Sequence, residues 1–308
     1  MGITFLFPGQ GSQFPGMGKE FYSKYPLIRE LFEAASDRLK LDFPKLMFND
    51  SPQLNQSRYT QPAILLFSAS LFKLLEAQLG ELQWSFGVGH SLGEFSALVG
   101  AGGLELVDGV ELVHKRGILM EEVFRDRAGS MLVVLGLSDQ EVEEICRESG
   151  LQIYPANYNC DGQVVVAGYR DQLEKALPLF KERGAKRALL LNMSVASHAP
   201  ILEPAVEPLR QLLEEYLAPQ FGRVVSNVTA EPYQTREEGL ELLPVQLTKP
   251  VRYKESIKRV EPETELFIEF GGKVLTGLNR KITKKRTYPV VDLPSFEKVG
   301  ELLASYEG

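Results

Sequence analysis

The sequence predicts an α/β protein in which a small domain is inserted into a large one. From the start of the chain to about residue 124, short apolar stretches alternate with longer amphipathic ones, which is typical of a layered α/β domain. Residues 127–196 instead follow the order β-α-β-β-α-β, the order of a ferredoxin-like unit. We therefore expect a large α/β-hydrolase-like domain with a parallel-sheet core, formed by residues 1–126 and 197–308, and a small ferredoxin-like domain formed by residues 127–196.

The large domain is expected to alternate short apolar strands with helices whose apolar residues recur at helical spacing. In its N-terminal part, the expected strands are Ile3–Phe7 and Ser85–Gly89, and the expected helices are Pro26–Leu39, Gln61–Leu79, Leu92–Ala101 and Val107–Phe124. In its C-terminal part, the expected helices are Ala199–Glu215 and Gly239–Gln246, and the expected strands are Arg223–Ser226 and Leu266–Phe270.

The small domain has its own turn and cap signals. Ser138 is followed three residues later by Glu141, which is the capping box that opens a helix. Asp161-Gly162 marks a turn between two strands. The expected strands are Ser130–Leu137, Leu151–Ala156, Gln163–Ala167 and Ala185–Met193, and the second expected helix is Asp171–Arg183.

Composition excludes several classes of function. The chain has 308 residues, 44% of them apolar, and a net charge of −7, so nucleic acid is not an expected partner. The two cysteines, Cys146 and Cys160, are too few for a disulfide framework. With three scattered histidines, we expect no metal site, and the glycine spacings match no nucleotide-binding loop.

The chain shows no targeting or membrane signal. Its first eight residues lack a cationic stretch followed by a cleavable apolar one. The most apolar helical stretch, Ala63–Leu75, is interrupted by Ser68, Ser70 and Lys73. We therefore expect a cytoplasmic protein without a membrane partner, and we expect a monomer.

The segment Gly89-His90-Ser91-Leu92-Gly93 has the pattern Gly-x-Ser-x-Gly between an expected strand and an expected helix. This arrangement exposes a serine hydroxyl on a tight turn, where a side chain at either glycine would clash. The N–H of Leu92 then faces any oxyanion formed on a substrate carbonyl. The pattern alone is short enough to occur by chance, but its position favours Ser91 as a nucleophile.

A nucleophilic serine needs a base, and only three histidines are available. His90 adjoins the serine and is expected to point elsewhere, and His114 lies at the edge of the apolar face of its helix. His198 lies in a polar loop between an expected strand and helix, where catalytic groups are often placed. Together with the serine motif, this position favours His198 as the base. Since no acidic residue is suitably placed, we expect a dyad oriented by a backbone carbonyl.

Arg116 falls in the middle of the apolar arc of helix Val107–Phe124. A buried arginine is unfavourable unless it meets an anion. One interpretation is an internal Arg–Glu pair. The other is that the guanidinium binds a carboxylate on the substrate through its two prongs.

With these residues identified, the whole chain resembles the malonyl-CoA:acyl carrier protein transacylase family, and more distantly the acyltransferase domains of polyketide synthases. The resemblance rests on landmarks in the same order along nearly the full length. They are Phe7-Pro8-Gly9-Gln10-Gly11-Ser12-Gln13, the Gly-His-Ser-Leu-Gly motif at Ser91, Arg116-Gly117, Asn157-Tyr158-Asn159, Gly162–Gly168, Ser197-His198, and Gln246 before Pro250-Val251.

The resemblance implies a ping-pong transfer of a malonyl group through a malonyl-Ser91 intermediate, supplying fatty acid biosynthesis. It implies that His198 is the base, that the N–H groups of Gln10 and Leu92 hold the oxyanion, and that Arg116 binds the malonyl carboxylate. The backbone carbonyl of Gln246 would orient His198. Asn157, Asn159 and Ser197 would line the cleft. No cofactor is implied beyond the substrates, malonyl-CoA and phosphopantetheinylated acyl carrier protein.

Two alternatives stay open. Val195–His198 lies where polyketide acyltransferase domains encode the choice of acyl group, and it is close to neither well-known variant. A polyketide-type acyltransferase that takes another carboxyacyl-CoA is therefore one alternative. The other is a serine hydrolase with the same serine motif, although a hydrolase has no use for a buried arginine facing the acyl group.

Acyl carrier protein is strongly acidic, so an acidic enzyme needs a local basic surface to receive it. Two clusters qualify. One comprises Lys181, Arg183, Lys186 and Arg187 of the small domain, and the other comprises Arg280, Lys281, Lys284, Lys285 and Arg286 near the C-terminus. We expect charge reversal of Lys284, Lys285 and Arg286 to weaken the interaction with the carrier protein but not with malonyl-CoA.

Overall fold

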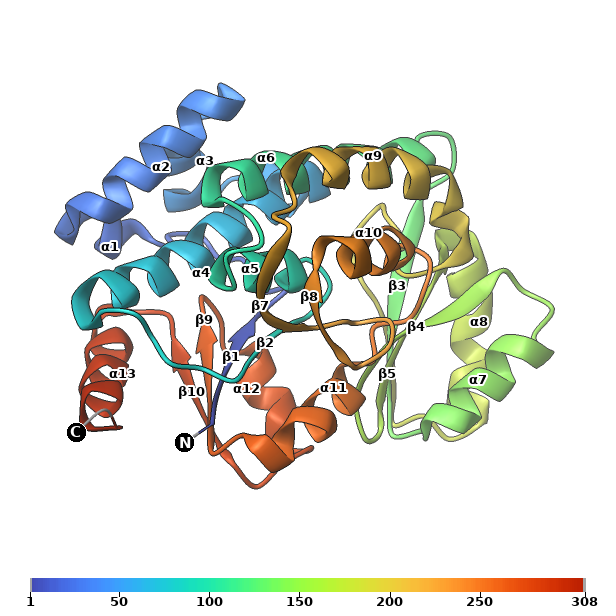
Figure 1. Ribbon diagram of the computed structural model, residues 1–308. Helices are drawn as coiled ribbons and strands as arrows, with labels where there is room; N and C mark the ends of the chain where they lie inside the picture. Colours follow the sequence, from blue (N-terminus) through green and yellow to red (C-terminus); the bar gives the residue numbers. More distant parts are fainter. Residues whose placement is uncertain (1, 307–308) are drawn as a thin grey trace.

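A mostly parallel six-stranded sheet forms the centre of the larger part of the molecule (Figure 1). The computed structural model describes residues 2–306, so positions 1, 307 and 308 of the expected large domain lie outside the described residues. The strand order is β10-β9-β1-β2-β7-β8, and only the β7–β8 pair is antiparallel. The strands are β1 (Ile3–Phe7), β2 (Phe86–Gly89), β7 (Gln220–Val225), β8 (Pro232–Thr235), β9 (Leu266–Phe270) and β10 (Arg286–Val290).

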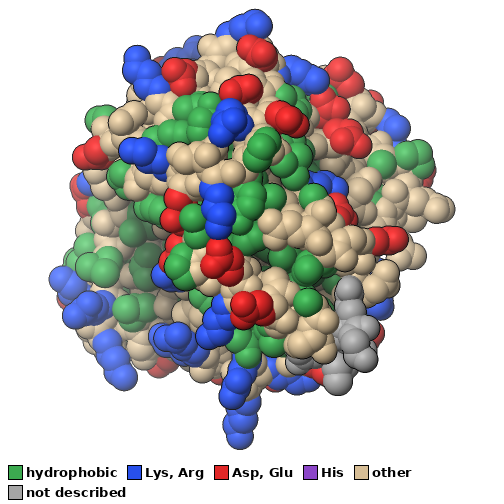
Figure 2. All heavy atoms as spheres, turned by 90° about the vertical axis from the view of Figure 1, so that its left-hand side faces the viewer, with side chains coloured by type: hydrophobic (Ala, Val, Ile, Leu, Met, Phe, Trp, Pro, Cys, Tyr) green, Lys and Arg blue, Asp and Glu red, His purple; other side chains and the backbone are tan. Residues whose placement is uncertain are grey.

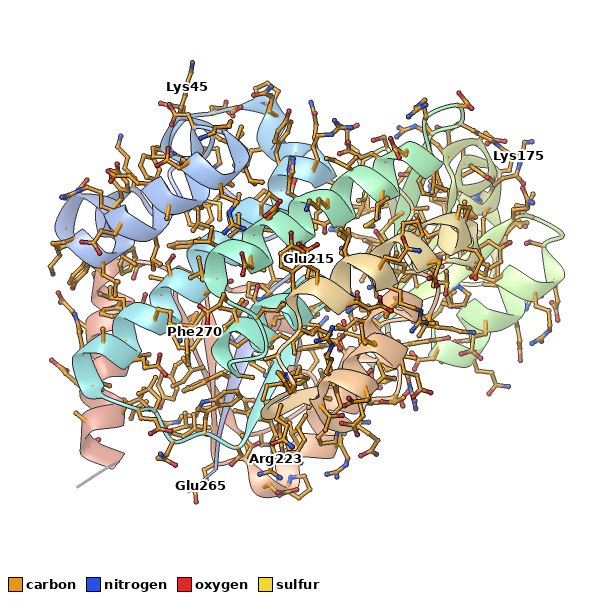
Figure 3. All side chains as sticks on the ribbon, turned by 45° about the horizontal axis from the view of Figure 1, so that its top comes forward. Lys45, Lys175, Glu215, Arg223, Glu265 and Phe270 are labelled. Atoms are coloured by element: carbon orange, nitrogen blue, oxygen red, sulfur yellow. The ribbon has the colours of Figure 1, made fainter. Side chains whose placement is uncertain are left out.

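The central strands of this sheet are buried on both faces. Every residue of β1 and of β9 is buried, as expected for parallel strands that are covered by helices on each side. Phe5, Phe72 and Phe270 contact one another edge-on inside the core. Figure 3 shows Phe270 inside the ring of helices, whereas Lys45, Lys175 and Glu265 stand on the outside.

Helices surround the sheet, and the two longest, α4 and α6, pack along each other. The helices of this part are α1 (Lys19–Lys24), α2 (Pro26–Leu39), α3 (Phe43–Phe48), α4 (Ser57–Leu79), α5 (Gly93–Gly100), α6 (Leu106–Val123), α9 (Val206–Tyr216), α10 (Arg236–Val245), α11 (Tyr253–Val260), α12 (Val274–Asn279) and α13 (Leu293–Tyr306). Short 3₁₀ turns lie at Pro52–Asn55, Pro200–Ala205 and Glu261–Glu263.

Helix α4 is long and apolar enough, by length and composition, to cross a membrane. In this fold it is a core helix, because 72% of its most apolar window is buried inside the protein. It begins at Ser57, four residues before the expected start at Gln61, although Pro62 lies inside it. Pro62 has no N–H to donate to the carbonyl of Arg58. His114 Nδ1 lies 2.7 Å from that carbonyl oxygen and supplies the missing donor.

A separate antiparallel sheet with its own core forms the smaller part, at the right of Figure 1. Its strands lie in the order β4-β5-β3-β6, and helices α7 (Asp139–Glu148) and α8 (Arg170–Glu182) pack on it. The expected capping box at Ser138 and Glu141 is present. The strands are β3 (Gly129–Leu135), β4 (Ile153–Cys160), β5 (Gln163–Tyr169) and β6 (Arg187–Leu190).

Backbone hydrogen bonds join the two parts beside β4. The N–H of Val251 donates to the carbonyl of Ala156 at 2.8 Å, and the N–H of Tyr158 donates to the carbonyl of Val251 at 2.9 Å. Val251 itself is fully buried. The antiparallel sheet is therefore fixed against the larger part at the strand that carries Asn157 and Asn159.

Several expected elements differ in extent. The helix expected at Ala199–Glu215 is a 3₁₀ turn followed by α9, because Pro204 has no N–H for a continuous α-helix. The strand expected at Ala185–Met193 is only β6. The elements that were not expected are α1, α3, α11, α12, α13, β8 and β10. Five of them, α1, α3, α12, β8 and β10, have only four to six residues, which is too short a stretch to show a clear periodicity.

Candidate active site

The turn from β2 into α5 carries Ser91 in a left-handed backbone conformation, with φ of 54°. Such a conformation is strained for a residue with a side chain, and it is found mostly where function requires it. A Cβ on Gly89 would lie 1.9 Å from the backbone carbon of Gly93. A Cβ on Gly93 would lie 1.9 Å from the carbonyl oxygen of Phe7. The two glycines thus allow the chain to fold back on itself and on β1, as the motif predicted.

His198 lies against the serine. Its Nε2 is 2.7 Å from Ser91 Oγ, and its Nδ1 is 2.7 Å from the carbonyl oxygen of Gln246. Because a carbonyl only accepts, Nδ1 carries the proton and Nε2 is free to accept the serine proton. Burial, with the nearby charge of Arg116, lowers the pKa of His198 to about 3, so the imidazole is neutral near pH 7. The pair has the geometry of a nucleophile and its general base.

Arg116 of α6 is 1% exposed and lies beside the same serine. Its Nη1 donates to Gln61 Oε1 at 2.6 Å and its Nη2 donates to Gln246 Oε1 at 3.0 Å. Nη2 is also 3.5 Å from Ser91 Oγ, and Nε has no partner among the described residues. Burial lowers the pKa of Arg116 to about 10, which still leaves the guanidinium charged at neutral pH.

The interpretation of Arg116 as half of an internal Arg–Glu pair does not describe this geometry. Within residues 2–306, no carboxylate oxygen lies within 4.0 Å of its guanidinium nitrogens. Its hydrogen-bond acceptors are the neutral amides of Gln61 and Gln246. The charge of Glu94 acts on Arg116 only at longer range, so the guanidinium can still make a direct contact with an anion from outside.

A cleft of ≈ 370 Å³ lies between the two sheets, with Ser91, His198 and Arg116 in its wall. Asn157, Asn159 and Ser197 line it, and Asn159 Oδ1 lies 2.8 Å from Nε2 of His90. His90, expected to point elsewhere, therefore reaches the cleft through this contact. Gln10 and Leu92 also line the cleft, and their backbone N–H groups donate to no acceptor within the described chain. Both amides are thus available to an oxyanion.

Four further residues complete the cluster, and the sequence analysis did not identify them. They are Gln61, Glu94, Asn227 and Tyr233. Asn227 Oδ1 accepts from the N–H of Ser91 at 2.6 Å, and its Nδ2 donates to the carbonyl of Gly89 at 2.7 Å. Asn227 thus holds both ends of the strained turn. Glu94 carried the same signal as Arg116, a charged residue on an apolar helix, and could have been found by it.

The two basic clusters lie on the surface, with one exception. Lys186, Arg187, Arg280, Lys284 and Arg286 are exposed. Lys285 is half-buried, and its Nζ donates to the carbonyls of Glu261, at 2.6 Å, and of Thr264. The expectation that Lys285 is available to a partner therefore needs correction, because its ammonium group ties the end of α11 to β10.

Comparison with known proteins places this geometry in a family. Residues 4–291 match the acyl transferase domain family. A malonyl CoA-acyl carrier protein transacylase of Bacillus subtilis (strain 168) is 40% identical over 304 residues, which cover 96% of this chain and 95% of that protein. The protein of the same description in Escherichia coli (strain K12) is 37% identical over 300 residues, covering 95% and 96%.

Solved structures agree with this similarity over the whole fold. The crystal structure of malonyl-CoA:acyl carrier protein transacylase from Helicobacter pylori has a TM-score of 0.97, with 43% identity and 99% of each chain covered. A malonyl-transacylase in complex with a type II polyketide synthase acyl carrier protein has a TM-score of 0.93, with 35% identity and 98% and 100% of the chains covered. The chain is therefore an acyltransferase that belongs to the malonyl-CoA:acyl carrier protein transacylase family.

Proposed function

We propose that this protein transfers the malonyl group of malonyl-CoA to the phosphopantetheine thiol of acyl carrier protein, through a malonyl-Ser91 intermediate. The observation that carries the proposal is the convergence on Ser91 Oγ of a base, His198 Nε2 at 2.7 Å, and a cation, Arg116 Nη2 at 3.5 Å. The first suits acyl transfer in general, and the second selects an acyl group with a free carboxylate.

In the first half-reaction, Ser91 Oγ attacks the thioester carbonyl carbon while His198 Nε2 takes its proton. The N–H groups of Gln10 and Leu92 stabilise the oxyanion, and Arg116 binds the malonyl carboxylate. The carbon–sulfur bond then breaks, and the proton on His198 passes to the coenzyme A sulfur. The Gln246 carbonyl stabilises the transient imidazolium through Nδ1–H.

In the second half-reaction, the thiol of the carrier protein gives its proton to His198 and attacks the malonyl ester carbon. The carbon–oxygen bond to Ser91 breaks, and His198 returns the proton to Ser91 Oγ. Coenzyme A and the phosphopantetheine group of the carrier protein have the same pantetheine arm. Malonyl-CoA and the carrier protein can therefore use one cleft in turn, which is a ping-pong scheme. No cofactor takes part in either step.

We further infer that the product supplies fatty acid synthesis in the cytoplasm and that the enzyme acts as a monomer. The alternative pathway is polyketide synthesis, since one similar structure holds a type II polyketide synthase carrier protein. Ser197, of the segment Val195–His198, lines the cleft, so this segment can affect the choice among carboxylated acyl groups. The serine-hydrolase alternative has no support from the relatives in Bacillus subtilis and Escherichia coli described above, which are both named transacylases.

The two sheets also support a division into domains. We infer that residues 127–196 form a ferredoxin-like domain inserted into an α/β-hydrolase-like domain of residues 1–126 and 197–308. The support is the order β4-β5-β3-β6 with two helices and a separate hydrophobic core. The inserted domain would form part of the active site, because residues of its strands β3, β4 and β5 line one wall of the cleft between the sheets.

Intact-mass measurement tests the proposed function. The protein is mixed separately with malonyl-CoA, methylmalonyl-CoA and acetyl-CoA, and then with phosphopantetheinylated acyl carrier protein. We expect a malonyl adduct that Ser91→Ala abolishes and that the carrier protein removes. A malonyl adduct retained in Ser91→Ala, or one lost to water as fast as to the carrier protein, would refute the proposal.

A further inference from the structure

Glu94 is a buried carboxyl group behind the nucleophile that the transfer scheme does not use. It lies in the first turn of α5, three residues after Ser91, and is 1% exposed. It is not among the residues that line the cleft. It therefore does not touch the substrate, and any effect it has on the reaction must pass through its neighbours.

Every group that contacts the carboxyl of Glu94 is a neutral donor. The N–H of Asn227 donates to Oε2 at 3.0 Å, Gln246 Nε2 donates to Oε2 at 2.7 Å, and the hydroxyl of Tyr233 donates to Oε1 at 2.9 Å. No cation lies within ion-pair distance of Glu94 in the described part of the chain. Three donors on two oxygens fit an ionised carboxylate, which only accepts.

The side-chain amide of Gln246 connects Glu94 to Arg116. Its Nε2 faces Glu94 and the carbonyl of Ser91, at 2.7 and 3.1 Å, and its Oε1 accepts from Arg116 Nη2 at 3.0 Å. A carboxylate only accepts and a guanidinium only donates, so the amide has a single orientation. The negative and positive charges of the cluster are thus coupled through one amide.

The charges of this cluster balance only while no substrate is bound. Arg116 on α6 and Glu94 on α5 carry opposite charges. Tyr233 on β8, whose pKa is raised by burial and by Glu94, and His198, whose pKa is lowered by burial, are both neutral near pH 7. A malonyl carboxylate bound to Arg116 would leave one excess negative charge in a buried site, which is strongly unfavourable.

Glu94 is the group best able to remove that excess charge. Burial raises its pKa to about 7, so its ionised and protonated forms are close in free energy near neutral pH. When Glu94 is protonated on Oε1, the hydroxyl of Tyr233 can turn so that its oxygen accepts a hydrogen bond from the carboxyl O–H. The other two partners keep donating to Oε2, so the cluster can accommodate the proton without losing a hydrogen bond.

Given the transfer function above, we propose that Glu94 is the counter-charge of the carboxylate site. It is ionised while the site is empty, and it takes up one proton from solvent when a carboxylated acyl group binds Arg116. It is a positioning residue that acts through Gln246. Binding of an uncharged acyl group brings no excess charge and requires no proton.

Linkage gives the sign of the pH effect. Since the malonyl-bound state holds more protons than the empty state, affinity for malonyl-CoA falls as pH rises above the pKa of Glu94 in the empty site, by at most about tenfold per pH unit. Affinity for acetyl-CoA is not subject to this loss. The preference for malonyl over acetyl groups therefore decreases from pH 7 to pH 9.

Calorimetry measures the proton directly. Ser91→Ala, which cannot form the ester, is titrated at pH 8 with malonyl-CoA and with acetyl-CoA in buffers of different ionisation enthalpy. We expect malonyl-CoA to take up nearly one proton more than acetyl-CoA. The double variant Ser91→Ala/Glu94→Gln should show no difference between the two. Equal proton uptake for both ligands in Ser91→Ala would overturn the proposal.

Steady-state kinetics provide a second readout in the enzyme that turns over. The ratio of kcat/KM for malonyl-CoA to that for acetyl-CoA should fall with pH in the native protein and stay constant in Glu94→Gln. Tyr233→Phe keeps the carboxyl group of Glu94 but removes its hydrogen-bond acceptor, so malonyl transfer should be weakened at pH 7 as well as at pH 9. A ratio in Glu94→Gln that is lower than native at every pH would indicate a merely structural role and would overturn the proposal.

The two proposals can fail separately. A native protein that forms no malonyl-Ser91 would refute the transfer function. A native protein that forms it, with no proton uptake linked to malonyl binding, would refute only the role of Glu94.

Discussion

At the scale of the residue, Arg116 is a buried cation that forms no direct ion pair, because its hydrogen-bond partners are neutral and the charge of Glu94 acts on it only at longer range. Its two amide acceptors, Gln61 and Gln246, hold the guanidinium in position, and the Phe95 ring lies 5.3 Å from it. A site of this kind is preorganised for a carboxylate, because the rigid guanidinium fork need not rearrange to bind it.

Arg116→Ala should therefore change specificity more than it changes chemistry. Loss of a charge-assisted contact to a buried carboxylate costs about 3 kcal/mol, or roughly a hundredfold in kcat/KM for malonyl-CoA. Acetyl-CoA makes no such contact, so its kcat/KM should change less than about fivefold. Stopped-flow measurement of Ser91 acylation with both thioesters checks this. Equal losses for the two would contradict the carboxylate role.

The pH dependence of His198 is a second residue-scale prediction. An ordinary histidine would gain a proton below about pH 6.5 and stop acting as a base. Burial and Arg116 lower the pKa of His198 to about 3, so the base stays neutral as the pH falls. Acylation of Ser91 by acetyl-CoA should accordingly be nearly constant from pH 8 to pH 5. In Arg116→Ala, which removes one of the causes that lower the pKa of His198, the fall at low pH should begin at a higher pH than in the native protein.

The sequence predicted part of this cluster because three of its members carry strong signals. Ser91 has its glycine motif, His198 is one of three histidines, and Arg116 interrupts an apolar arc. Asn227 and Tyr233 carry no such signal, since asparagine at a strand end and tyrosine in a strand are common in any fold. Each of them contacts a residue more than a hundred positions away in the sequence, so only the folded structure shows that it belongs to the cluster.

At the scale of the element, the β2–α5 turn is where packing and chemistry depend on each other. Helix α5 starts so close to β1 that its first residue, Gly93, has no room for a side chain beside Phe7. This contact places the helix N-terminus, and the N–H of Leu92, at the floor of the cleft.

Gly93→Ala should therefore destabilise the fold, by about 3 kcal/mol or more, because the contact is with backbone atoms that cannot move aside. Gly277→Ala is the matched control. Gly277 lies in α12 with no atom within 4 Å of an added Cβ, and alanine there should stabilise the helix by about 0.5–1 kcal/mol. Thermal unfolding of both variants checks the pair. A Gly93→Ala protein with the native unfolding temperature would contradict the close approach of α5 to β1.

The boundaries of helices and strands were predicted well where the hydrophobic pattern continues over several turns. They were predicted poorly where the pattern is short or where a contact from elsewhere in the chain changes the element. Helices α2 and α6 lie within a residue of their expected ends, since each has several turns of amphipathic pattern. Strand β10, at the edge of the sheet, begins with Arg286 and is mostly half-buried, so it lacks the apolar run that marks a central strand. The early start of α4 depends on His114, which no local pattern connects to Pro62.

At the scale of the whole molecule, the cleft is made by two sheets that the chain builds in separate stretches. The order of elements predicted the two sheets, but not which strand of one would face the other. Backbone bonds at Val251 determine that contact. Figure 2 shows the face with α1, α2 and α13. Charged side chains of both signs are mixed on it, and Lys and Arg side chains gather along its lower edge. The net charge of −7 is therefore not evenly spread over the surface.

This uneven distribution leads to a test of the carrier-protein surface. Arg280→Glu/Lys284→Glu should raise the KM for acyl carrier protein several-fold at low salt and leave the KM for malonyl-CoA unchanged, because the acidic partner is steered by exposed charge. Lys186→Glu/Arg187→Glu tests the other cluster in the same way. Lys285 is left out, since its ammonium group bonds to the backbone.

The matched control is Lys45→Glu/Lys175→Glu, which makes the same change in net charge at two exposed positions. Figure 3 shows these two side chains standing outward, one on α3 and the other on α8. If only net charge mattered, the control would raise the KM for the carrier protein as much as the cluster variants do. If one cluster docks the partner, its variant alone should show a large effect, and that effect should shrink at 0.5 M salt, where the screening length falls to about 4 Å. Unchanged carrier-protein kinetics in both cluster variants at low salt would exclude both surfaces.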